Sequence, residues 1–390
     1  MIPEKTRASA PGHHGSRAPR AVLPVFLLAA LALLTLTAWG CARAQETTTT
    51  APGGGANSTT TVVEPKPDEL VLMTHDSFAA SEGVLEAFTA ETGVKVRVLK
   101  SGDAGAMLNQ AILTKSNPLA DVLYGVDNTF LSRALKEDLF VPYTSPLLET
   151  VPAQLQLDAE HRVTPIDFGD VTLNYDKQAF AASGLAVPGS LRDLTKPEYK
   201  SKLVVEDPST SSPGLAFLLA TIAEFGETGD YTWQDYWRDL KANGVLAVSG
   251  WEEAYYSSFS GGSGEGDRPL VVSYASSPAA EVVYSEKPVT EAPTGVIATG
   301  AFRQIEFAGV LRGSKHPVWA GRLIDFLLSK RFQEDIPLNM FVFPANSEAK
   351  LPDVFVKYTT VPENPLTLAP EQIGANRERW IEEWARIVLR

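Results

Sequence analysis

Short apolar runs alternate with longer stretches of helical spacing through most of this chain, and the apolar runs repeatedly end in a polar loop. The first run, DELVLMTHDSF, turns polar at Thr74 and precedes AASEGVLEAFTAETG, where Val84, Leu85 and Phe88 lie at helical spacing and Gly93 ends the helix. An alternation of strands and helices predicts an α/β fold with a largely parallel sheet.

The alternation runs in two series. The first continues through VKVRVLKSGD, AGAMLNQAILTKSNP and ADVLYGVDNTFLSRALKEDLF, and the second extends from VTPIDFGDVTLNYDK to PLVVSYASSPAAE. A further strand, RQIEFAGVLRG, and two amphipathic helices follow, the last of them in PEQIGANRERWIEEWARIVLR. With 390 residues, 44% of them hydrophobic, the chain is large enough to form two lobes.

The first forty residues have the pattern of an export signal. Basic residues precede the uncharged run AVLPVFLLAALALLTLTAWG, which is long enough to span a bilayer. This run ends at GCARAQ, where two cleavage patterns overlap, and their presence favours removal over an uncleaved anchor. Cleavage before Cys41 would leave a lipidated cysteine, whereas cleavage after Ala44 would leave no lipid anchor. We favour the lipoprotein.

Residues 41 to 68 are rich in Thr, Gly and Pro, which predicts a flexible tether between the lipid and the folded part. Cys41 is the one cysteine of the chain, so the folded part has no disulfide, cysteine metal cluster or thiol catalyst. A net charge of −13 argues against nucleic acid as a partner. We therefore expect an exported protein held at the outer face of the cytoplasmic membrane.

Acidic residues follow several of the predicted strands, at the edge of an α/β sheet where ligands bind. Asp76, Asp103 and Asp127 each stand at such a strand end. A carboxylate there either pairs with a positively charged ligand or caps the next helix. For any one of them alone, capping is the simpler interpretation.

Aromatic and hydroxyl side chains occupy other strand ends. Trp251 follows the Ser-Gly pair of SGWEE, and it either stacks on an aromatic or cationic ligand or packs in the core. Tyr274 ends an apolar run directly before Ser276 and Ser277, a cluster rich in hydrogen-bonding groups. This cluster indicates contact with a polar ligand.

A second hydroxyl cluster precedes the apolar helix LAFLLATIAEF. Its members, Ser209, Thr210, Ser211 and Ser212, either cap the helix or help its backbone N–H groups to bind an anion. The sequence contains no HExxH motif, P-loop, GxGxxG fingerprint or GxSxG elbow, so we expect no metal and no cofactor.

The polar loops occur in a specific order. The segments HDSFAASEG, LADVLYGVDNTFLSRA, DFGDVTLNYDK, EDPSTSSPGLAFLLA, SGWEEAYYSSF, VVSYASSPA and RERWIEEWARIVLR together resemble bacterial thiamine-binding proteins, the extracytoplasmic solute receptors of an ABC transporter. The resemblance extends from about Glu69 to Arg390. It implies the two-lobed type 2 periplasmic-binding-protein fold, in which each lobe is a mixed, mostly parallel sheet flanked by helices and the ligand cleft lies between the lobes. Residues 69–167 with 279–390 would form lobe 1, and residues 168–278 lobe 2.

In that family, aromatic side chains and a carboxylate hold the cationic thiazolium and the pyrimidine, while hydroxyl-rich loops take the alcohol or phosphate end. The chain departs from the family pattern at several positions: His75 stands in place of a tyrosine, Glu82 of a tryptophan and Ala280 of a tyrosine, and Met340 is the nearest equivalent of another tryptophan. Tyr284 or Phe341 could fill the vacated stacking space. The ligand-binding residues that the resemblance implies are His75, Asp76, Glu82, Asp103, Ala104, Ser209, Thr210, Ser211, Ser212, Trp251, Tyr274, Ser276, Ser277 and Met340.

The resemblance implies a receptor that binds thiamine or a thiamine phosphate by lobe closure and delivers it to the transmembrane subunits of an ABC permease. Alternatives are a receptor for another small cationic solute, or one for ferric ion that would use the adjacent Tyr255 and Tyr256. A thiamine-degrading enzyme of similar architecture would need a nucleophilic cysteine, and no cysteine follows Cys41. We therefore expect a binding protein and no enzyme.

Overall fold

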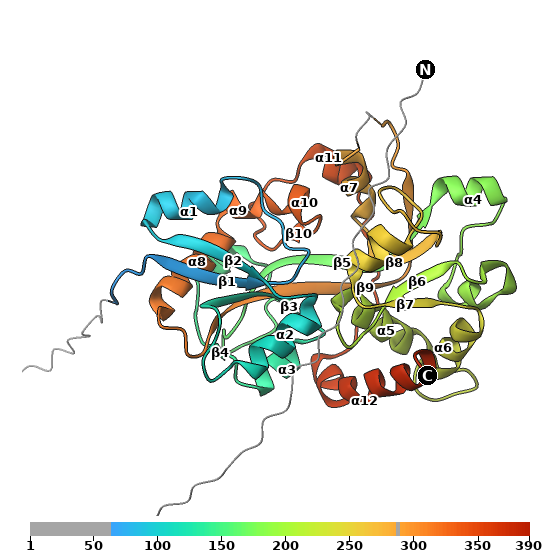
Figure 1. Ribbon diagram of the computed structural model, residues 1–390, viewed down its shortest axis with the longest axis horizontal. Coiled ribbons are helices and arrows are strands. Elements are labelled where there is room, and N and C mark those ends of the chain that lie inside the picture. Colours follow the sequence, from blue (N-terminus) through green and yellow to red (C-terminus); the bar gives the residue numbers. More distant parts are fainter. Residues whose placement is uncertain (1–63, 286–288) are drawn as a thin grey trace, which may run out of the picture. The chain divides into compact units, whose positions relative to one another are not determined.

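The computed structural model describes residues 64–285 and 289–390 (Figure 1). The predicted export signal, the lipidation site at Cys41 and most of the tether lie outside these residues. The tether's last residues contact the fold: Glu64 accepts a hydrogen bond from the backbone N–H of Val318 (3.0 Å), and Pro67 is buried. In the part of the chain that the structure describes, no helix is both long and apolar enough to span a membrane.

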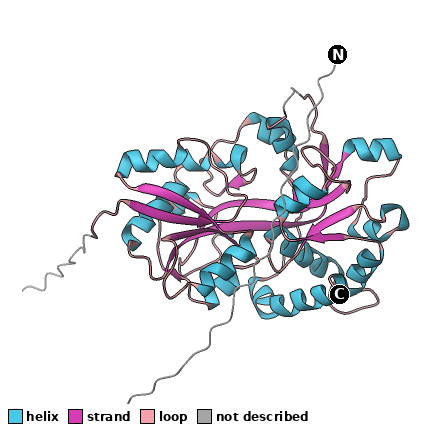
Figure 2. Cartoon of the chain, in the orientation of Figure 1, coloured by secondary structure: helices cyan, strands magenta, loops and turns pink. Residues whose placement is uncertain are grey.

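Helices and strands alternate along the chain as the sequence predicts (Figure 2). The strands are β1 (Glu69–Thr74), β2 (Lys95–Lys100), β3 (Val122–Asp127), β4 (Phe140–Val141), β5 (Thr164–Asp176), β6 (Leu203–Glu206), β7 (Leu246–Val248), β8 (Leu270–Tyr274), β9 (Thr294–Leu311) and β10 (Phe343–Pro344). The helices are α1 (Val84–Thr92), α2 (Ala104–Leu113), α3 (Leu131–Lys136), α4 (Lys177–Ser183), α5 (Ser212–Phe225), α6 (Trp233–Ala242), α7 (Ser277–Val283), α8 (Pro317–Leu328), α9 (Lys330–Gln333), α10 (Ile336–Asn339), α11 (Asp353–Tyr358) and α12 (Pro370–Val388), with a π-helical turn at Glu253–Ser258. Gly93 caps α1 with a φ of 71°, which confirms the predicted helix end.

The strands form one mixed sheet in the order β2-β1-β3-β9-β5-β8-β6-β7, with β4 beside β9 and β10 beside β5. Strands β2, β1 and β3 are parallel to one another, and so are β8, β6 and β7. Each parallel group therefore directs its carboxyl ends to one edge, and the expected mixture of strand directions is confirmed.

Two long antiparallel strands, β5 and β9, join the two parallel groups (Figure 1). They pair from Thr164 opposite Ala308 to Asp176 opposite Thr294, with register shifts near Pro165 and Val171. Strand β9 begins well before the predicted RQIEFAGVLRG because the Gly- and Thr-rich residues ahead of that segment pair with β5. Such residues carry no apolar alternation, so the sequence pattern alone does not reveal them.

The predicted lobe boundaries fall inside secondary structure. The boundary between residues 167 and 168 lies within β5, and that between 278 and 279 lies within α7. The division into lobe 1 and lobe 2 stays a prediction, for which the two parallel strand groups are the structural counterpart.

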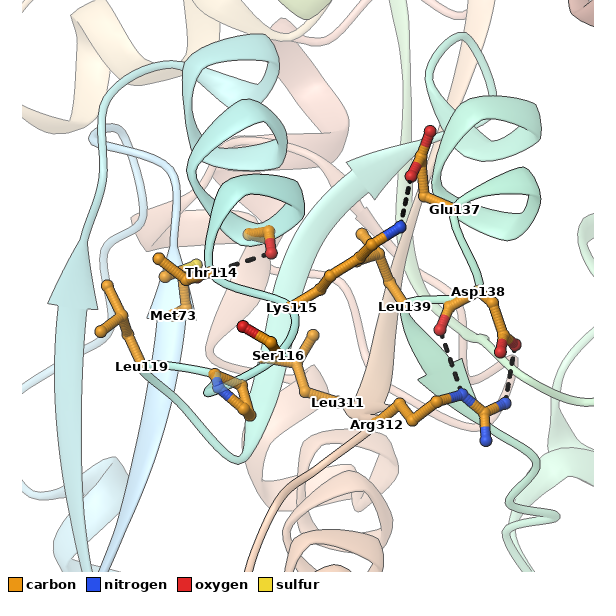
Figure 3. A pocket seen from close by; sticks show the side chains of 12 residues that line it. Met73, Thr114, Lys115, Ser116, Leu119, Glu137, Asp138, Leu139, Leu311 and Arg312 are labelled. Carbon is orange, nitrogen blue, oxygen red and sulfur yellow. Dashed lines mark hydrogen bonds and ion pairs between the residues drawn. The ribbon is translucent and has the colours of Figure 1, made fainter. Parts of the chain in front are cut away.

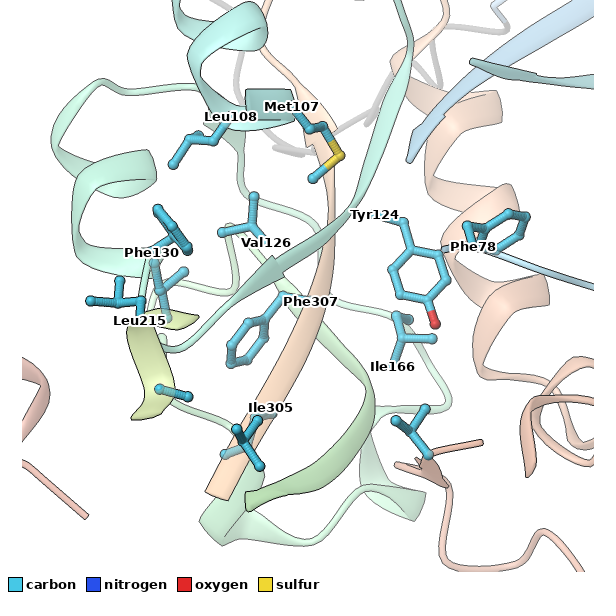
Figure 4. Packing of buried hydrophobic residues seen from close by; sticks show 14 of the residues in the cluster. Phe78, Met107, Leu108, Tyr124, Val126, Phe130, Ile166, Leu215, Ile305 and Phe307 are labelled. Atoms are coloured by element: carbon cyan, nitrogen blue, oxygen red, sulfur yellow. The ribbon is translucent and has the colours of Figure 1, made fainter. Parts of the chain in front are cut away.

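Close packing fixes the positions of the helices and loops that follow the carboxyl ends of the strands. Every residue of α5 from Ser212 to Ile222 is buried, and Gly214 lets the helix approach β6, because a Cβ there would lie 2.6 Å from the carbonyl oxygen of Glu206. Beside the first strand group, Phe78 meets Tyr124 edge to face at 5.6 Å between ring centroids (Figure 4). These contacts hold the polar loops in fixed positions.

The C-terminal helix α12 packs against α6 and α3. Trp384, which is fully buried, meets Trp237 of α6 edge to face at 5.5 Å, and Trp380 is also fully buried. The predicted apolar face of this helix is confirmed. Because α3 follows β3 and α6 precedes β7, the helix ties elements of both strand groups together.

Replacing Trp384 with alanine should lower the free energy of unfolding by about 3 to 5 kcal/mol, because the change removes a large buried side chain and leaves a cavity. Chemical denaturation followed by circular dichroism measures the effect. Glu382→Ala, at an exposed position of the same helix, is the control and should shift stability by less than about 0.5 kcal/mol. Equal effects of the two changes would contradict the packing described here.

Candidate functional site

A cavity of about 450 Å³ opens where the carboxyl ends of the two parallel strand groups meet. It is lined by loops that follow β1, β2, β7 and β8, by the start of α5, by the middle of β9 and by the segment after α10. Its size suits a small organic molecule. This is the edge at which the sequence predicts a ligand.

The structure brings most of the predicted ligand-binding residues to this cavity. The lining includes His75, Asp76, Asp103, Ala104, Ser212, Trp251, Tyr274, Ser277 and Met340. The remaining predicted residues are not among the lining side chains: Glu82, Ser209, Thr210, Ser211 and Ser276. Glu82 is exposed at the start of α1, and Ser209 donates its hydroxyl to Asp207 (2.6 Å) in a turn before α5.

Carboxylates outnumber cations around the cavity. The acidic lining residues are Asp76, Asp103, Glu252, Glu281 and Glu306, and the basic ones are Lys100 and His75. Lys100 donates from Nζ to the carbonyl oxygen of Asp76 (2.8 Å). An excess of carboxylates in a partly desolvated site favours a positively charged occupant.

Asp103 connects the two strand groups. Its Oδ1 accepts from the N–H of Ala104 (2.7 Å) at the start of α2, and its Oδ2 accepts from the N–H of Trp251 (3.1 Å). Burial raises the pKa of Asp103, against the lowering effect of these two N–H groups and of His75. The carboxylate thus caps the helix and also lines the cavity, and its pairing with a charged ligand stays a prediction.

Aromatic rings form a second wall. Trp251 stacks on Tyr255 with ring centroids 5.0 Å apart and planes 21° apart, and it meets Tyr256 edge to face at 5.4 Å. The indole Nε1 donates to the hydroxyl of Ser273 (2.8 Å). The ring orientation depends on the π-helical turn that follows, which is wider than an α-helical turn.

A chain of polar contacts connects the lining residues Tyr274, Glu306 and His75. Tyr274 donates its hydroxyl to Gln304 Oε1 (3.0 Å), and Gln304 Nε2 donates to Glu306 Oε1 (2.8 Å). The other carboxylate oxygen of Glu306 lies 3.4 Å from Nε2 of His75. The phenol, the amide, the carboxylate and the imidazole therefore form one polar network.

Backbone geometry and charge both determine the state of His75. Gly125 has a φ of 112°, and a Cβ there would lie 2.4 Å from the imidazole, so only glycine leaves room for this ring. Burial lowers the pKa of His75, but the charge and hydrogen bond of Glu306, aided by Asp103 and Asp167, raise it to about 9. The imidazole is thus positively charged at neutral pH.

Further acids lie buried behind the lining. Tyr124 donates its hydroxyl to Asp167, whose pKa burial and the charge of Glu306 raise well above its usual value. Burial likewise raises the pKa of Glu206 well above its usual value, and that of Asp127 to about 6. Asp127 caps the turn before α3 by accepting from the N–H and hydroxyl of Thr129 (2.7 and 2.6 Å). A raised pKa favours the protonated form, so the negative charge of the site comes more from its lining than from these groups.

The segment after α10 forms the rim. Phe341 has a φ of 54°, and its ring meets that of Tyr284 edge to face at 5.4 Å. Ser276, although outside the lining, donates its hydroxyl to the carbonyl of Phe341 and so fixes this segment. Tyr284, Phe341 and Ala280 all line the cavity.

Cavities also occur beside this one and away from it. An adjoining one of about 570 Å³ shares Asp103 and Trp251 with the first and is lined by Thr210, whose hydroxyl donates to the carbonyl of Ser249 (2.7 Å). A separate one of about 340 Å³ lies at the far end of α2, and its cations are already paired, Lys115 with Glu137 and Arg312 with Asp138, at 2.7 Å each (Figure 3).

Sequence analysis missed several lining residues, among them Glu306, Glu281, Lys100 and Phe78. Glu306 lies inside a strand, and its signal was the polar pair of Gln304 and Glu306 on one face of an otherwise apolar run. Among the residues that the structure describes, no group of three or more His, Cys, Asp or Glu is arranged to hold a metal ion.

Residues 117–361 match the model of a family described as bacterial extracellular solute-binding protein. Among characterised relatives, the thiamine-binding periplasmic proteins of Escherichia coli and Salmonella typhimurium are 32% and 31% identical to this chain. Each alignment covers 82% of this chain and 94% of the relative.

Solved structures agree with these relatives. A periplasmic thiamin-binding protein superposes with a TM-score of 0.72 at 29% identity, and the match covers 84% of this chain and all of that one. Iron-bound HitA from Pseudomonas aeruginosa superposes with a TM-score of 0.65 at 19% identity over 82% of this chain and 99% of its own. The second match concerns the fold alone.

The raised pKa of Asp127 predicts how stability depends on pH. Between its unfolded pKa of about 3.8 and its folded pKa of about 6, the folded state binds more protons, so the free energy of unfolding falls as the pH rises through this window. Asp127→Asn removes this group while keeping the acceptor for Thr129. Urea denaturation from pH 4 to 7 should show a shallower decline for the variant than for the wild type, and parallel curves would contradict the prediction.

Proposed function

The chain belongs to the bacterial extracellular solute-binding proteins, and from this premise we propose that its solute is thiamine or a thiamine phosphate, bound in the 450 Å³ cavity. The protein is the solute-binding component of an ABC importer. The observation that carries the choice of solute is the combination of excess carboxylates and stacked aromatic rings in one cavity.

Thiamine carries a permanently charged thiazolium, an aminopyrimidine and a hydroxyethyl arm. Moving such a cation out of water is costly unless fixed carboxylates and the faces of aromatic rings replace its hydration. Asp103 and Glu306 supply the carboxylates, and Trp251, whose other face is covered by Tyr255, supplies the ring face. We assign the cation to the space between these two walls.

The polar ends of the ligand have partners as well. Tyr274, Ser277 and Ser212 line the cavity and carry hydroxyls that suit the aminopyrimidine or the hydroxyethyl arm. Among the lining residues in the described part of the chain, Lys100 is the one lysine or arginine, so a phosphate on that arm has a single such partner.

The alternatives fit this cavity less well. For ferric ion, the adjacent tyrosines would both need to reach the metal, but Tyr255 is buried under Trp251 while Tyr256 is 45% exposed. A different small organic cation would use the same walls, and competition with thiamine separates the two cases. We propose no catalytic role, because no cysteine follows Cys41 and the relatives are named as binding proteins.

The protein acts outside the cytoplasm, as its periplasmic relatives do. We further propose that a lipid on Cys41 holds it at the outer face of the cytoplasmic membrane, which the sequence pattern around that cysteine supports. The closed, loaded form would then dock on the transmembrane subunits of the importer.

Purified protein should bind thiamine in isothermal titration calorimetry with a Kd of about 1 μM or tighter, because the cavity has partners for both the thiazolium cation and the aminopyrimidine ring of thiamine. Thiamine monophosphate and diphosphate serve as comparison ligands, and Fe³⁺ tests the metal alternative. If no form of thiamine produced a heat of binding or raised the Tm, the proposed solute would be excluded.

Trp251→Ala should weaken thiamine binding by about 1 to 3 kcal/mol, because the change removes the ring face that stacks on the cation. Trp251→Phe is the matched variant, which keeps a ring but loses the hydrogen bond to Ser273, and it should lose less. Thermal unfolding checks that both variants fold. If Trp251→Ala bound thiamine as well as the wild type, the indole would have only a packing role.

A further inference from the structure

His75 and Glu306 form an ion pair inside the cavity that is proposed to receive a cation. Their closest atoms, Nε2 and Oε2, are 3.4 Å apart, and the two side chains are 10% and 8% exposed. Both residues line the cavity. Before the ligand binds, the charged imidazole of His75 is therefore the counter-ion of the Glu306 carboxylate.

This arrangement creates a competition for one carboxylate. A second positive charge placed beside Glu306 also lies close to the imidazole, where like charges repel in partly desolvated surroundings. The ligand cation cannot lose its charge, whereas the imidazole can lose a proton. Loss of the imidazole proton would therefore relieve the repulsion.

We propose that His75 is a proton-exchanging specificity residue: when the solute cation binds, His75 releases a proton, and the cation takes over the role of counter-ion to Glu306. The inference rests on the proposed function. The proton passes from the imidazolium to bulk water, the imidazole becomes neutral, and no covalent bond forms or breaks. The net charge of the cavity is thereby the same before and after loading.

The surroundings of His75 support this exchange. The ionisable groups that face it are Glu306 from β9, Asp167 from β5 and Asp103 before α2, while Asp76, Lys100 and Tyr274 line the same cavity. The three facing acids raise the pKa of His75 to about 9 against the lowering effect of burial, so the proton is present to be released at neutral pH. Gly125 fixes the position of the ring, because a Cβ there would lie 2.4 Å from it.

The exchange has a direction with pH. Ligand binding lowers the pKa of His75, so the affinity for the cation rises with pH between the loaded and the free pKa values and is constant above about 9. Acidification therefore favours release. Neutral molecules of the same shape gain nothing from deprotonation and should bind with little pH dependence.

Calorimetric titration of thiamine into the purified protein at pH 7.5, in buffers of different ionisation enthalpy, measures the protons released. We expect about one proton per thiamine bound and an affinity that rises roughly 3- to 10-fold per pH unit between pH 6.5 and 8. His75→Gln should abolish both effects. His316→Gln, a histidine outside the cavity that pairs with Glu64, is the control and should keep them.

The outcomes separate this inference from the proposed function. Thiamine binding without proton release would overturn the exchange and leave the function intact, and release that persists in His75→Gln would assign the proton to another group. Failure of thiamine to bind would remove the function and the exchange together. Nuclear magnetic resonance titration of His75 in the ligand-free protein adds an independent test, because a pKa at or below 6.5 would overturn the exchange whether or not thiamine binds.

Discussion

Buried acidity is the constraint on which this structure depends. Strand ends and the middle of β9 bring Asp103 and Glu306 to the cavity, and Asp127, Asp167 and Glu206 lie buried behind them. Burial raises the pKa of four of these acids, because water cannot solvate their carboxylates fully, and a carboxylate that stays ionised there needs a positive partner. The stacked rings beside them complete a site for a small organic cation, and the charged imidazole of His75 fills part of that role within the protein itself.

The sequence predicted those features that depend on local pattern. His75, Asp103, Trp251 and Tyr274 follow apolar runs, and each reaches the cavity because parallel strands direct their carboxyl ends to one edge. Glu306 was missed because it lies within a strand, and its place in the cavity depends on the pairing of β9 with β5. Of the four hydroxyl residues before α5, Ser212 lines this cavity and Thr210 the adjoining one, because the turn before the helix directs the other two elsewhere.

Contacts across the cavity involve the backbone as much as the side chains. The N–H of Gly105 in α2 donates to the carbonyl of Thr210 (2.8 Å), and the N–H of Trp251 donates to Asp103. Substitution of side chains alone therefore leaves part of this connection in place. Gly105 also permits the approach, because a Cβ there would lie 2.7 Å from the carbonyl oxygen of Ser209.

The two long strands that join the halves of the sheet also carry charge. Asp167 of β5 lies opposite Glu306 of β9 in their ladder, beside the register shift near Pro165. A bend of this strand pair at that point would therefore displace both acids together. The flexibility of β5 and β9 and the electrostatic potential at the cavity are therefore linked. A more rigid strand pair would alter both the affinity for the solute and the rate of its release.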